Sequence, residues 1–535
     1  MDPLLAKIRR LNEIGVALSA EKDTPRLLER ILVGAKELTG ADGGTLYSVG
    51  PDDRLHFEIL HNDSLGIAQG GTSGTPVALP PIPLHTPEGA PNTRMVAAYA
   101  VLRDATVNIP DAYAEKGFDF SGTREFDRRT GYRSRSFLTV PLKDHEGEII
   151  GALQLINARA AGGAVVPFSR EDQHLTESLA SQAAAAVTKQ RLITGLKELF
   201  ESFVRAMAVA IDEKSPYTAG HCRRVAELAL MLADAACEAD SGSLRDFRLT
   251  EEERVELEMA AWLHDCGKVT VPEHVIDKAT KLQGVFDRIH LVDARIEILK
   301  REAEIRFLRR RIAALEKGRA PGDDGDERRL AAELRELEDD RRFLHACNDG
   351  REFLPDADRD RLRRVARRCW TGPGGVPQPL LADDEVENLS IRRGTLNERE
   401  RRLINNHVTA TLKILETLPY PRHLRRIPEI AGGHHERVDG KGYPRGLKGE
   451  EMSVQARIMA VADIFEALTA RDRPYKKGKS LEEALGILAA MKDEGHIDPE
   501  IFEVFVRSGV HRRYAERHLA AGDGGPSSPG PAAPG

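Results

Sequence analysis

The apolar positions of the N-terminal third change their spacing several times. In residues 3–20 and 24–41 they fall three or four apart, which predicts two amphipathic helices. Strand-like apolar patterns follow at residues 43–49, 54–60, 134–144 and 148–157. The last two of these flank a hairpin-type turn. Strands bracketed by helices predict an α+β domain over residues 24–190, preceded by an N-terminal helix within residues 1–23.

Beyond this domain the pattern becomes that of one long helix, predicted to connect two domains over residues 173–215. Apolar residues recur there every seven positions: Leu179, Ala186, Ile193, Phe200 and Met207. Gln182 and Lys189 interrupt the neighbouring seam, so the coiled-coil pattern is clearest after about residue 193. Two interpretations stay open: a helix packed on its own domain, or a parallel dimer stalk that carries a signal to the next domain.

The C-terminal part, residues 198–517, has helical periodicity almost throughout and predicts an all-α domain. Residues 283–392 differ from it, because they contain two highly charged helical stretches separated by a turn-rich break. We expect an inserted antiparallel helical hairpin, which is either a solvated projection or dimer contact, or a docking site for another protein. The Gly- and Pro-rich residues 522–535 predict a disordered tail.

Composition narrows the possible partners and location of the chain. Its 535 residues suffice for two or three domains, and the net charge of −7 argues against a general binder of DNA or RNA polymers. The 5 cysteines form no CxxC pair, which suits a reducing compartment. No apolar run approaches the ~18–20 residues that span a bilayer. We therefore expect a soluble, cytoplasmic protein that has no membrane partner.

Histidines and aspartates recur at inward helix positions or tight turns in four separated segments of the C-terminal domain. The set is His221, His264, Asp265, His407, His434, His435 and Asp463. An aspartate on an apolar helix stripe, such as Asp463, is costly unless its charge is compensated. Together the imidazoles and carboxylates exceed the needs of one divalent ion and fit two ions that share a carboxylate. Mixed nitrogen and oxygen ligation suits Fe, Mn or Zn, and the lack of a cysteine cluster argues against structural zinc.

Three motifs carry a family resemblance. The sequences HDCGK (264–268), HHERVDGKGYP (434–444) and ADIFEAL (462–468) followed by RPY resemble the HD-GYP family of metal-dependent phosphohydrolases. The resemblance covers residues 198–282 and 393–515. It implies an enzyme that hydrolyses cyclic di-GMP to pGpG, and in a further step to GMP, with two divalent metal ions. Iron is the first choice of metal and manganese the second.

The resemblance also implies roles for individual residues. One ion would be held by His221, His264, Asp265 and Asp463, and the other by Asp265, His407, His434 and His435. Asp265 would bridge the two ions. Lys268 would contact a substrate phosphate, and Tyr443, Arg473 and Lys476 would contact the rest of the substrate. Relatives with a third metal carry Glu where this chain has Tyr217, so two ions are expected.

Two other functions stay open for the C-terminal domain. It could be an HD-type phosphohydrolase for another cyclic dinucleotide, or a catalytically silent nucleotide receptor or scaffold. In the N-terminal domain, the motif at residues 131–157 resembles a GAF domain, and the resemblance covers residues 24–190. It implies regulation of the enzyme by an unidentified small-molecule ligand. Asn157 is followed by Ala158 where cyclic-nucleotide-binding members have Lys. A GAF domain that only dimerises is therefore an alternative, and a homodimer is expected in either case.

Overall fold

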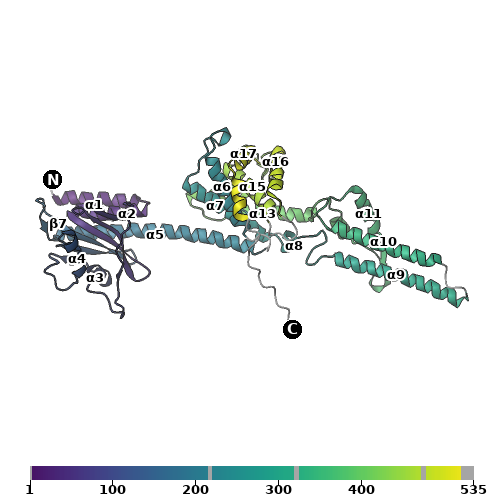
Figure 1. Ribbon diagram of the computed structural model, residues 1–535, viewed down its shortest axis with the longest axis horizontal. Helices are drawn as coiled ribbons and strands as arrows, with labels where there is room; N and C mark the ends of the chain where they lie inside the picture. Colours follow the sequence, from purple (N-terminus) through teal and green to yellow (C-terminus); the bar gives the residue numbers. More distant parts are fainter. Residues whose placement is uncertain (1–2, 215–219, 319–323, 471–477, 520–535) are drawn as a thin grey trace. The chain divides into compact units, whose positions relative to one another are not determined.

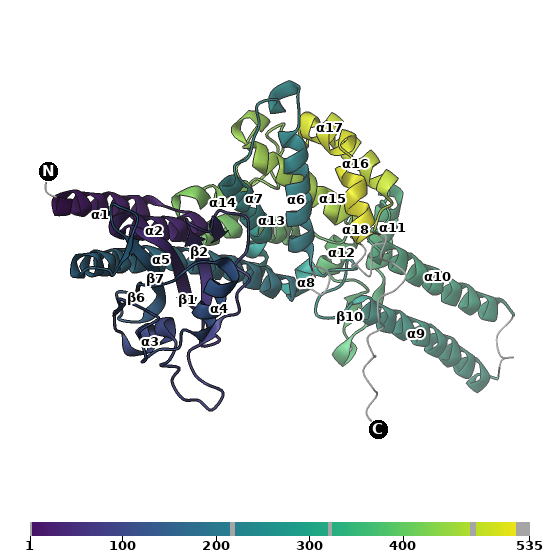
Figure 2. The same cartoon turned by 60° about the vertical axis from the view of Figure 1, so that its left-hand side comes forward.

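The computed structural model of the chain forms two compact units, Met1–Phe200 and Glu201–Gly535 (Figures 1 and 2). The residues that it describes are 3–214, 220–318, 324–470 and 478–519. Tyr217, Arg473, Lys476 and the tail 522–535 lie outside these residues, so the predictions made for them stay predictions. Among the described residues, none of the helices combines the length and the apolar character needed to cross a membrane.

The first unit is an antiparallel sheet with helices on both faces, in the order β3-β2-β1-β7-β6-β5, with β4 beside β2 and β8 beside β7. Its helices are α1 (Pro3–Ala20), α2 (Thr24–Thr39), α3 (Val96–Arg103) and α4 (Ser121–Thr130). Its strands are β1 (Ala41–Val49), β2 (Arg54–Asn62), β3 (Ile67–Gly70), β4 (Ile82–Pro83), β5 (Val107–Ile109), β6 (Phe137–Lys143), β7 (Ile149–Arg159) and β8 (Val165–Val166). The predicted α+β fold is confirmed, and the predicted helices and long strands are present.

The core of this unit explains the apolar patterns. Helices α1 and α2 pack on one face of the sheet, where Ile14, Ile31 and Leu153 share one apolar cluster, and α3 covers part of the other face (Figure 1). Strand β7 is central and covered on both faces, so its sequence is a nearly continuous apolar run. Strands β3, β4, β5 and β8 have two to four residues. Such short strands are too short to show an alternating pattern in the sequence.

Helix α5 (Arg170–Asp212) is the predicted long helix, and its two halves differ. Leu175 and Leu179 are buried in the core of the first unit. From Leu192 onward, apolar side chains are exposed at three- and four-residue spacing: Leu192, Leu196, Leu199 and Phe203. The first half is therefore packed on its own domain, and the second half keeps the pattern of a coiled coil.

The second unit is helical, as predicted. Its main helices are α6 (His221–Cys237), α7 (Glu251–Leu263), α8 (Glu273–Ile276), α13 (Glu398–Leu415), α14 (Ile427–Gly432), α15 (Val454–Thr469), α16 (Leu481–Asp493), α17 (Pro499–Arg507) and α18 (Val510–His518). Capping boxes start α7 at Thr250 and α13 at Asn397.

The insertion contains more than the predicted hairpin. Helices α9 (Ile289–Glu316) and α10 (Asp324–Asn348) pack side by side, joined by ion pairs such as Lys300–Glu338 (Figures 1 and 2). The segment that follows adds α11 (Asp356–Ala366), β9 (Cys369–Thr371), β10 (Pro377–Pro379) and α12 (Asp383–Leu389). These elements share an apolar cluster with α9 and α10, so the insertion has a core of its own. The sequence did not predict these elements because each of them is short and the segment is highly charged.

Candidate metal centre

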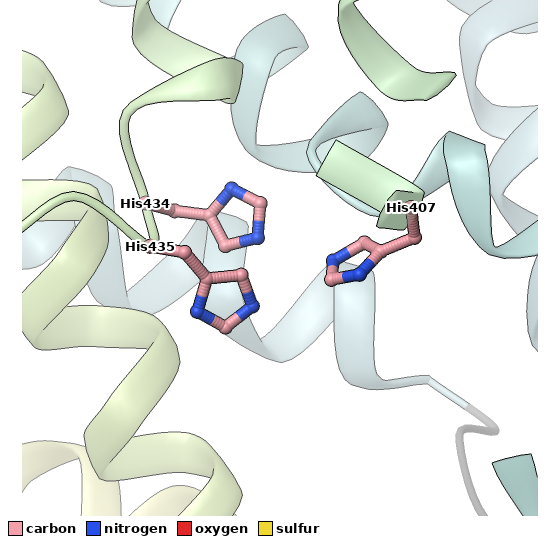
Figure 3. A group of neighbouring side chains, drawn as sticks. All are labelled: His407, His434 and His435. Carbon is pink, nitrogen blue, oxygen red and sulfur yellow. The ribbon is translucent and has the colours of Figure 1, made fainter. Parts of the chain in front are cut away.

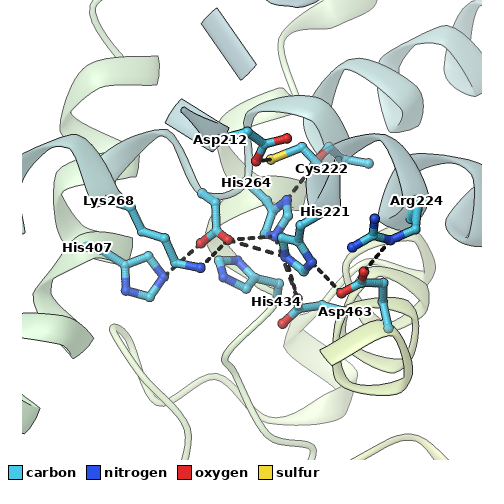
Figure 4. A network of polar contacts seen from close by, with 12 residues as sticks. Asp212, His221, Cys222, Arg224, His264, Lys268, His407, His434 and Asp463 are labelled. Carbon is cyan, nitrogen blue, oxygen red and sulfur yellow. Dashed lines mark hydrogen bonds and ion pairs between the residues drawn. The ribbon is translucent and has the colours of Figure 1, made fainter. Parts of the chain in front are cut away.

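The seven predicted ligand residues converge in the helical unit. Figure 4 shows His221, His264, His407, His434 and Asp463 turned toward one another. His221 begins α6, and His264 and Asp265 follow the end of α7. His407 lies on α13, Asp463 lies on α15, and the two adjacent histidines, His434 and His435, follow α14. Helix α6 packs against α7 and α15, while α13 packs against α14 and against the turn after α7. These contacts bring together residues up to 242 positions apart in the chain.

Asp265 lies at the centre of the cluster, and its two oxygens face different histidines. Oδ2 lies 3.4 Å from His221 Nε2 and 3.3 Å from His264 Nε2. Oδ1 lies 3.2 Å from His407 Nε2 on the other side. The second carboxylate, Asp463, has its Oδ1 3.3 Å from His221 Nε2 and 3.7 Å from His264 Nε2. This is the arrangement expected of a carboxylate shared by two cation sites.

The other side of the cluster consists of imidazoles (Figure 3). His407, His434 and His435 bring one ligand nitrogen each to within 4.8 Å of one another. The His434 and His435 rings have centroids 4.3 Å apart. His221, His264 and Asp265 form a second group with the same mutual spacing. The side chains thus form two adjoining donor sets.

Hydrogen bonds of the Nδ1 atoms orient the rings. Nδ1 of His264 lies 2.8 Å from the Ala261 carbonyl, and Nδ1 of His434 lies 2.5 Å from the Ala431 carbonyl. His407 makes the same contact, at 2.5 Å, with the carbonyl three residues earlier. Because a carbonyl only accepts, each Nδ1 donates, and in a neutral ring Nε2 then carries a lone pair.

The Nε2 atoms of His264, His407 and His434 are buried and make no hydrogen bond within the described part of the chain. A buried polar atom without a partner is costly, and ligation of a cation removes that cost. Nitrogen and carboxylate donors on converging helices also suit first-row divalent metals. The residues present therefore fit a metal centre.

The electrostatics differ between the two donor sets. Burial lowers the pKa of His264, but the carboxylates of Asp265 and Asp463 outweigh burial and raise it to about 9. Burial alone would raise the pKa of Asp265, yet the Lys268 ammonium and His264 hold it well below its usual range. The carboxylate side therefore attracts positive charge, either protons or metal ions.

On the imidazole side, protons are disfavoured. Burial, together with the neighbouring His435 and His264, lowers the pKa of His434 well below its usual value. Burial likewise lowers the pKa of His435 to about 4, despite the opposing attraction of Asp463. Both rings are therefore neutral at pH 7, the state in which an imidazole ligates a metal.

Glu466 contacts the donor cluster and was not predicted from the sequence. Its Oε2 lies 2.5 Å from His221 Nδ1, and its Oε1 accepts a hydrogen bond of 2.7 Å from Arg224 Nε. Its side chain is buried, one helical turn after Asp463 on α15. A carboxylate bonded to the far nitrogen of a ligating histidine fixes the ring and strengthens it as a donor. The three-residue spacing from Asp463 on an apolar helix was the available signal.

Gly267 follows the His264–Asp265 pair. Helix α7 ends at Leu263, and Gly267 lies in the 3-10 turn that comes after it. A Cβ atom on Gly267 would lie 1.9 Å from the His407 carbonyl oxygen. Its N–H instead donates to Thr411 Oγ1 at 2.9 Å. Gly267 therefore permits close packing of the turn on α13, which brings His407 to Asp265.

Two of the predicted substrate contacts adjoin the cluster. Lys268 Nζ donates to Asp265 Oδ2 at 2.5 Å, and its side chain retains 24% exposure, so a ligand can reach it. The Tyr443 ring stacks on His435, with centroids 4.8 Å apart and planes 21° apart. The other two, Arg473 and Lys476, lie outside the described residues.

Comparison with known families divides the chain in the same way. The GAF domain family matches residues 23–187. Two HD domain models match the helical unit, at residues 218–341 and 382–501. The second match begins close to the end of the insertion.

Among curated proteins, three relatives illustrate the similarity. The 3'3'-cGAMP-specific phosphodiesterase 3 of Vibrio cholerae is 40% identical over 28% of this chain and 29% of its own length. A cyclic di-GMP phosphodiesterase of Thermotoga maritima is 36% identical over 30% of this chain and 42% of its own. The cyclic di-GMP phosphodiesterase response regulator RpfG of Xanthomonas campestris is 29% identical over 40% and 61%.

The chain thus spans between 29% and 61% of the length of these relatives. The domain matches agree with the α+β fold of the first unit and with the helical second unit that carries the metal-type donor cluster. Residues 23–187 thus match the GAF domain family, and residues 218–341 and 382–501 match HD domains, whose fold is that of metal-dependent phosphohydrolases.

Proposed function

We propose that this protein is an HD-GYP phosphodiesterase that hydrolyses cyclic di-GMP to pGpG, and then to GMP, under the control of its GAF domain. The observation that carries the proposal is Asp265, whose two oxygens face separate groups of buried histidines. Relatives named cyclic di-GMP phosphodiesterases, 36% identical over matched segments, support the substrate class.

Two divalent ions are part of the proposal, with iron as the first choice and manganese as the second. One ion is assigned to His221, His264, Asp265 and Asp463, and the other to Asp265, His407, His434 and His435. Bound divalent ions supply Lewis acidity, which lowers the pKa of coordinated water and offsets charge on phosphoryl oxygens. In the net reaction, water adds to phosphorus, the P–O bond to a ribose 3′ oxygen breaks, and that oxygen gains a proton.

The protein's own side chains bind and orient the substrate. The Lys268 ammonium is partly exposed beside Asp265 and is assigned to a phosphate of the dinucleotide. Tyr443, stacked on His435, is assigned as a face for a guanine base. Arg473 and Lys476 complete the proposed substrate contacts. The Nδ1 hydrogen bonds keep the histidine rings in one orientation, so the donor set is organised before substrate arrives.

A second candidate substrate is 3'3'-cGAMP. Two relatives named 3'3'-cGAMP-specific phosphodiesterases are 40% and 39% identical to segments of this chain. The two cyclic dinucleotides differ in one base, so the metal centre serves both, and base contacts decide between them. Turnover of each dinucleotide by the purified protein under identical conditions distinguishes the candidates.

The decisive experiment is anaerobic purification of the full chain, with metal counting and a hydrolysis assay on the same sample. Nearly two ions per chain and cleavage of cyclic di-GMP are expected. Asp265→Asn is expected to lose metal and to lower turnover by more than about 100-fold, since it removes a ligand of both ions. Asp493→Asn, at an exposed carboxylate on α16, is the matched control. Wild-type turnover in Asp265→Asn would refute the bridging role.

The regulatory half of the proposal has two parts. A cavity of about 650 Å³ in the first unit is lined by Tyr47, Phe57, Tyr132 and Gln154, which suits a small ligand with an apolar body and few polar groups. The exposed seam on the second half of α5 supports a parallel homodimer. The 5 cysteines are unpaired, consistent with the proposed cytoplasmic location. Calorimetric titration of the full chain with cyclic nucleotides tests whether the GAF domain binds them. If no heat of binding is measured, a GAF domain that only dimerises is favoured.

A further inference from the structure

Helix α9 of the insertion has two apolar faces, and the described chain covers one of them. Val292, Ile296 and Leu299 are buried in the core that α9 shares with α10. Six other apolar residues of α9 are between 38% and 55% exposed; they form the α9 stripe, which consists of Leu291, Ile298, Ile305, Leu308, Ile312 and Leu315. Figures 1 and 2 show α10 alongside α9. The stripe lies on the side of α9 turned away from that buried face, as the helical spacing of the two sets requires.

The spacing of the stripe is that of a coiled coil. Ile298, Ile305 and Ile312 are seven residues apart, and Leu308 and Leu315 follow the last two by three residues. Isoleucine at the first position of the heptad with leucine at the fourth favours a parallel, two-stranded coiled coil. Arg301 occupies the fourth position of the preceding heptad, so the continuous apolar seam runs from Ile305 to Leu315.

Charges beside the seam select the same arrangement. In a parallel pair, the last residue of one heptad faces the fifth residue of the following heptad in the partner. Glu304 would then face Arg309 of the second copy, and Arg311 would face Glu316, so both contacts join opposite charges. In an antiparallel pair centred on this seam, Arg309 of one chain would face Arg309 of the other, and the two Arg311 side chains would face each other. Like charges would then meet. The sequence therefore favours a second, parallel copy of the same helix.

The ion pairs already present do not prevent this contact. Glu304 pairs with Arg301 at 2.7 Å, and Arg311 pairs with Glu327 at 3.0 Å. All four side chains are at least one-third exposed, and such pairs contribute little to stability, so they exchange readily. Arg309 and Glu316 form no ion pair within the described ranges.

We propose that the α9 stripe binds the α9 stripe of a second copy of this chain, in parallel register, through Ile305, Leu308, Ile312 and Leu315. The contact adds an interaction surface within the insertion to the homodimer proposed through α5. It uses none of the metal-centre residues, so its failure and a failure of the hydrolase proposal are distinguishable.

Cysteine crosslinking of the full chain tests the contact. In a parallel pair, residue 312 lies next to its own copy, whereas the exposed neighbour Ala313 lies off the seam. In a background with the exposed Cys369 replaced by Ser, oxidised Ile312→Cys is expected to form covalent dimers about 10-fold faster than Ala313→Cys, because a disulfide requires close Cβ atoms. Equal rates overturn the proposal.

Two further measurements fix the orientation and the role of charge. Glu304→Arg is expected to slow crosslinking of Ile312→Cys, and adding Arg309→Glu is expected to restore it, because the swap re-forms the pair in reverse. A charge swap without effect contradicts the proposed register. The Leu308→Cys and Ile312→Cys variants are also mixed. If the disulfide between the two different variants forms faster than the disulfides between identical variants, the contact is antiparallel and the parallel one is overturned. Far-UV circular dichroism of each variant is the folding control, and it does not depend on the hydrolase proposal.

Discussion

The substitution Glu466→Gln tests a residue that orients a proposed metal ligand without being a proposed ligand itself. The substitution keeps the size of the side chain and removes its charge. In the structure, Glu466 is 1% exposed and holds His221 Nδ1 at 2.5 Å. Among the influences on the pKa of His221, burial lowers it, and Glu466 is the strongest of those that raise it well above its usual value. The variant therefore turns a charged acceptor into a neutral one at the ring of a proposed ligand.

The expected magnitude follows from the contact. Loss of a carboxylate partner behind a ligating histidine typically weakens metal binding by about 10- to 100-fold, or about 1.4–2.7 kcal/mol. Arg224 also loses its bond to Glu466, and at 15% side-chain exposure it is only partly able to recover hydration. We therefore expect a lower midpoint of unfolding as well, so binding must be measured under conditions where the variant is fully folded by circular dichroism.

The assay is metal counting after dialysis against increasing chelator. The chelator concentration at which the wild-type protein releases each of its proposed ions is the reference. Glu466→Gln should release one ion at a concentration about 10- to 100-fold lower and keep the other, because His407, His434 and His435 do not contact Glu466. Glu450→Gln, at an exposed carboxylate of the same unit, is the control. Two ions retained with wild-type affinity in folded Glu466→Gln would refute the reasoning.

Three further predictions concern packing, charge and pH. Gly267→Ala should destabilise the protein by about 1–3 kcal/mol in denaturant unfolding, because its Cβ would meet a backbone carbonyl, whereas Gly486→Ala in open helix α16 should stabilise it by up to about 1 kcal/mol. Lys268→Gln should raise the KM for cyclic di-GMP more than it lowers kcat, and the reverse split would argue against phosphate binding. Metal affinity should increase with pH up to about 9, since the proton that carboxylates attract to His264 must leave when an ion binds. Isothermal titration in buffers of different ionisation enthalpy measures that proton release, and no release at pH 7 contradicts the assignment.

The sequence was sufficient to find the residues of the donor cluster because they break a pattern. Asp463 is a charge on an apolar stripe, and the His434–His435 pair precedes a run of turn residues, so each is conspicuous without coordinates. Glu466 was missed because one more acidic residue at a helix position resembles an ordinary solvent-facing residue until the helix is packed. Its burial depends on α6 lying against α15, a long-range contact that local pattern does not encode.

The insertion also shows what local sequence patterns cannot predict. Periodicity predicted two charged helices, and they are present, but α9 carries apolar residues on more than one face. Sequence alone could not decide which face packs on α10, because either set has helical spacing. The strands of two to four residues in the first unit were also beyond prediction, since they pair through the sheet rather than through their own apolar pattern.

The opposite pKa shifts on the two sides of Asp265 imply an order of metal loading. On the carboxylate side, the histidines attract protons, so positive charge is present there even without metal and ions must displace it. On the imidazole side, His434 and His435 are neutral well below pH 7, so an ion meets no proton competition from them. Lowering the pH therefore weakens the site of His221 and His264 first, while His434 and His435 stay available as donors. The two proposed ions would thus share a carboxylate but differ in the work needed to bind them, and we expect the site held by paired histidines to fill first in acid.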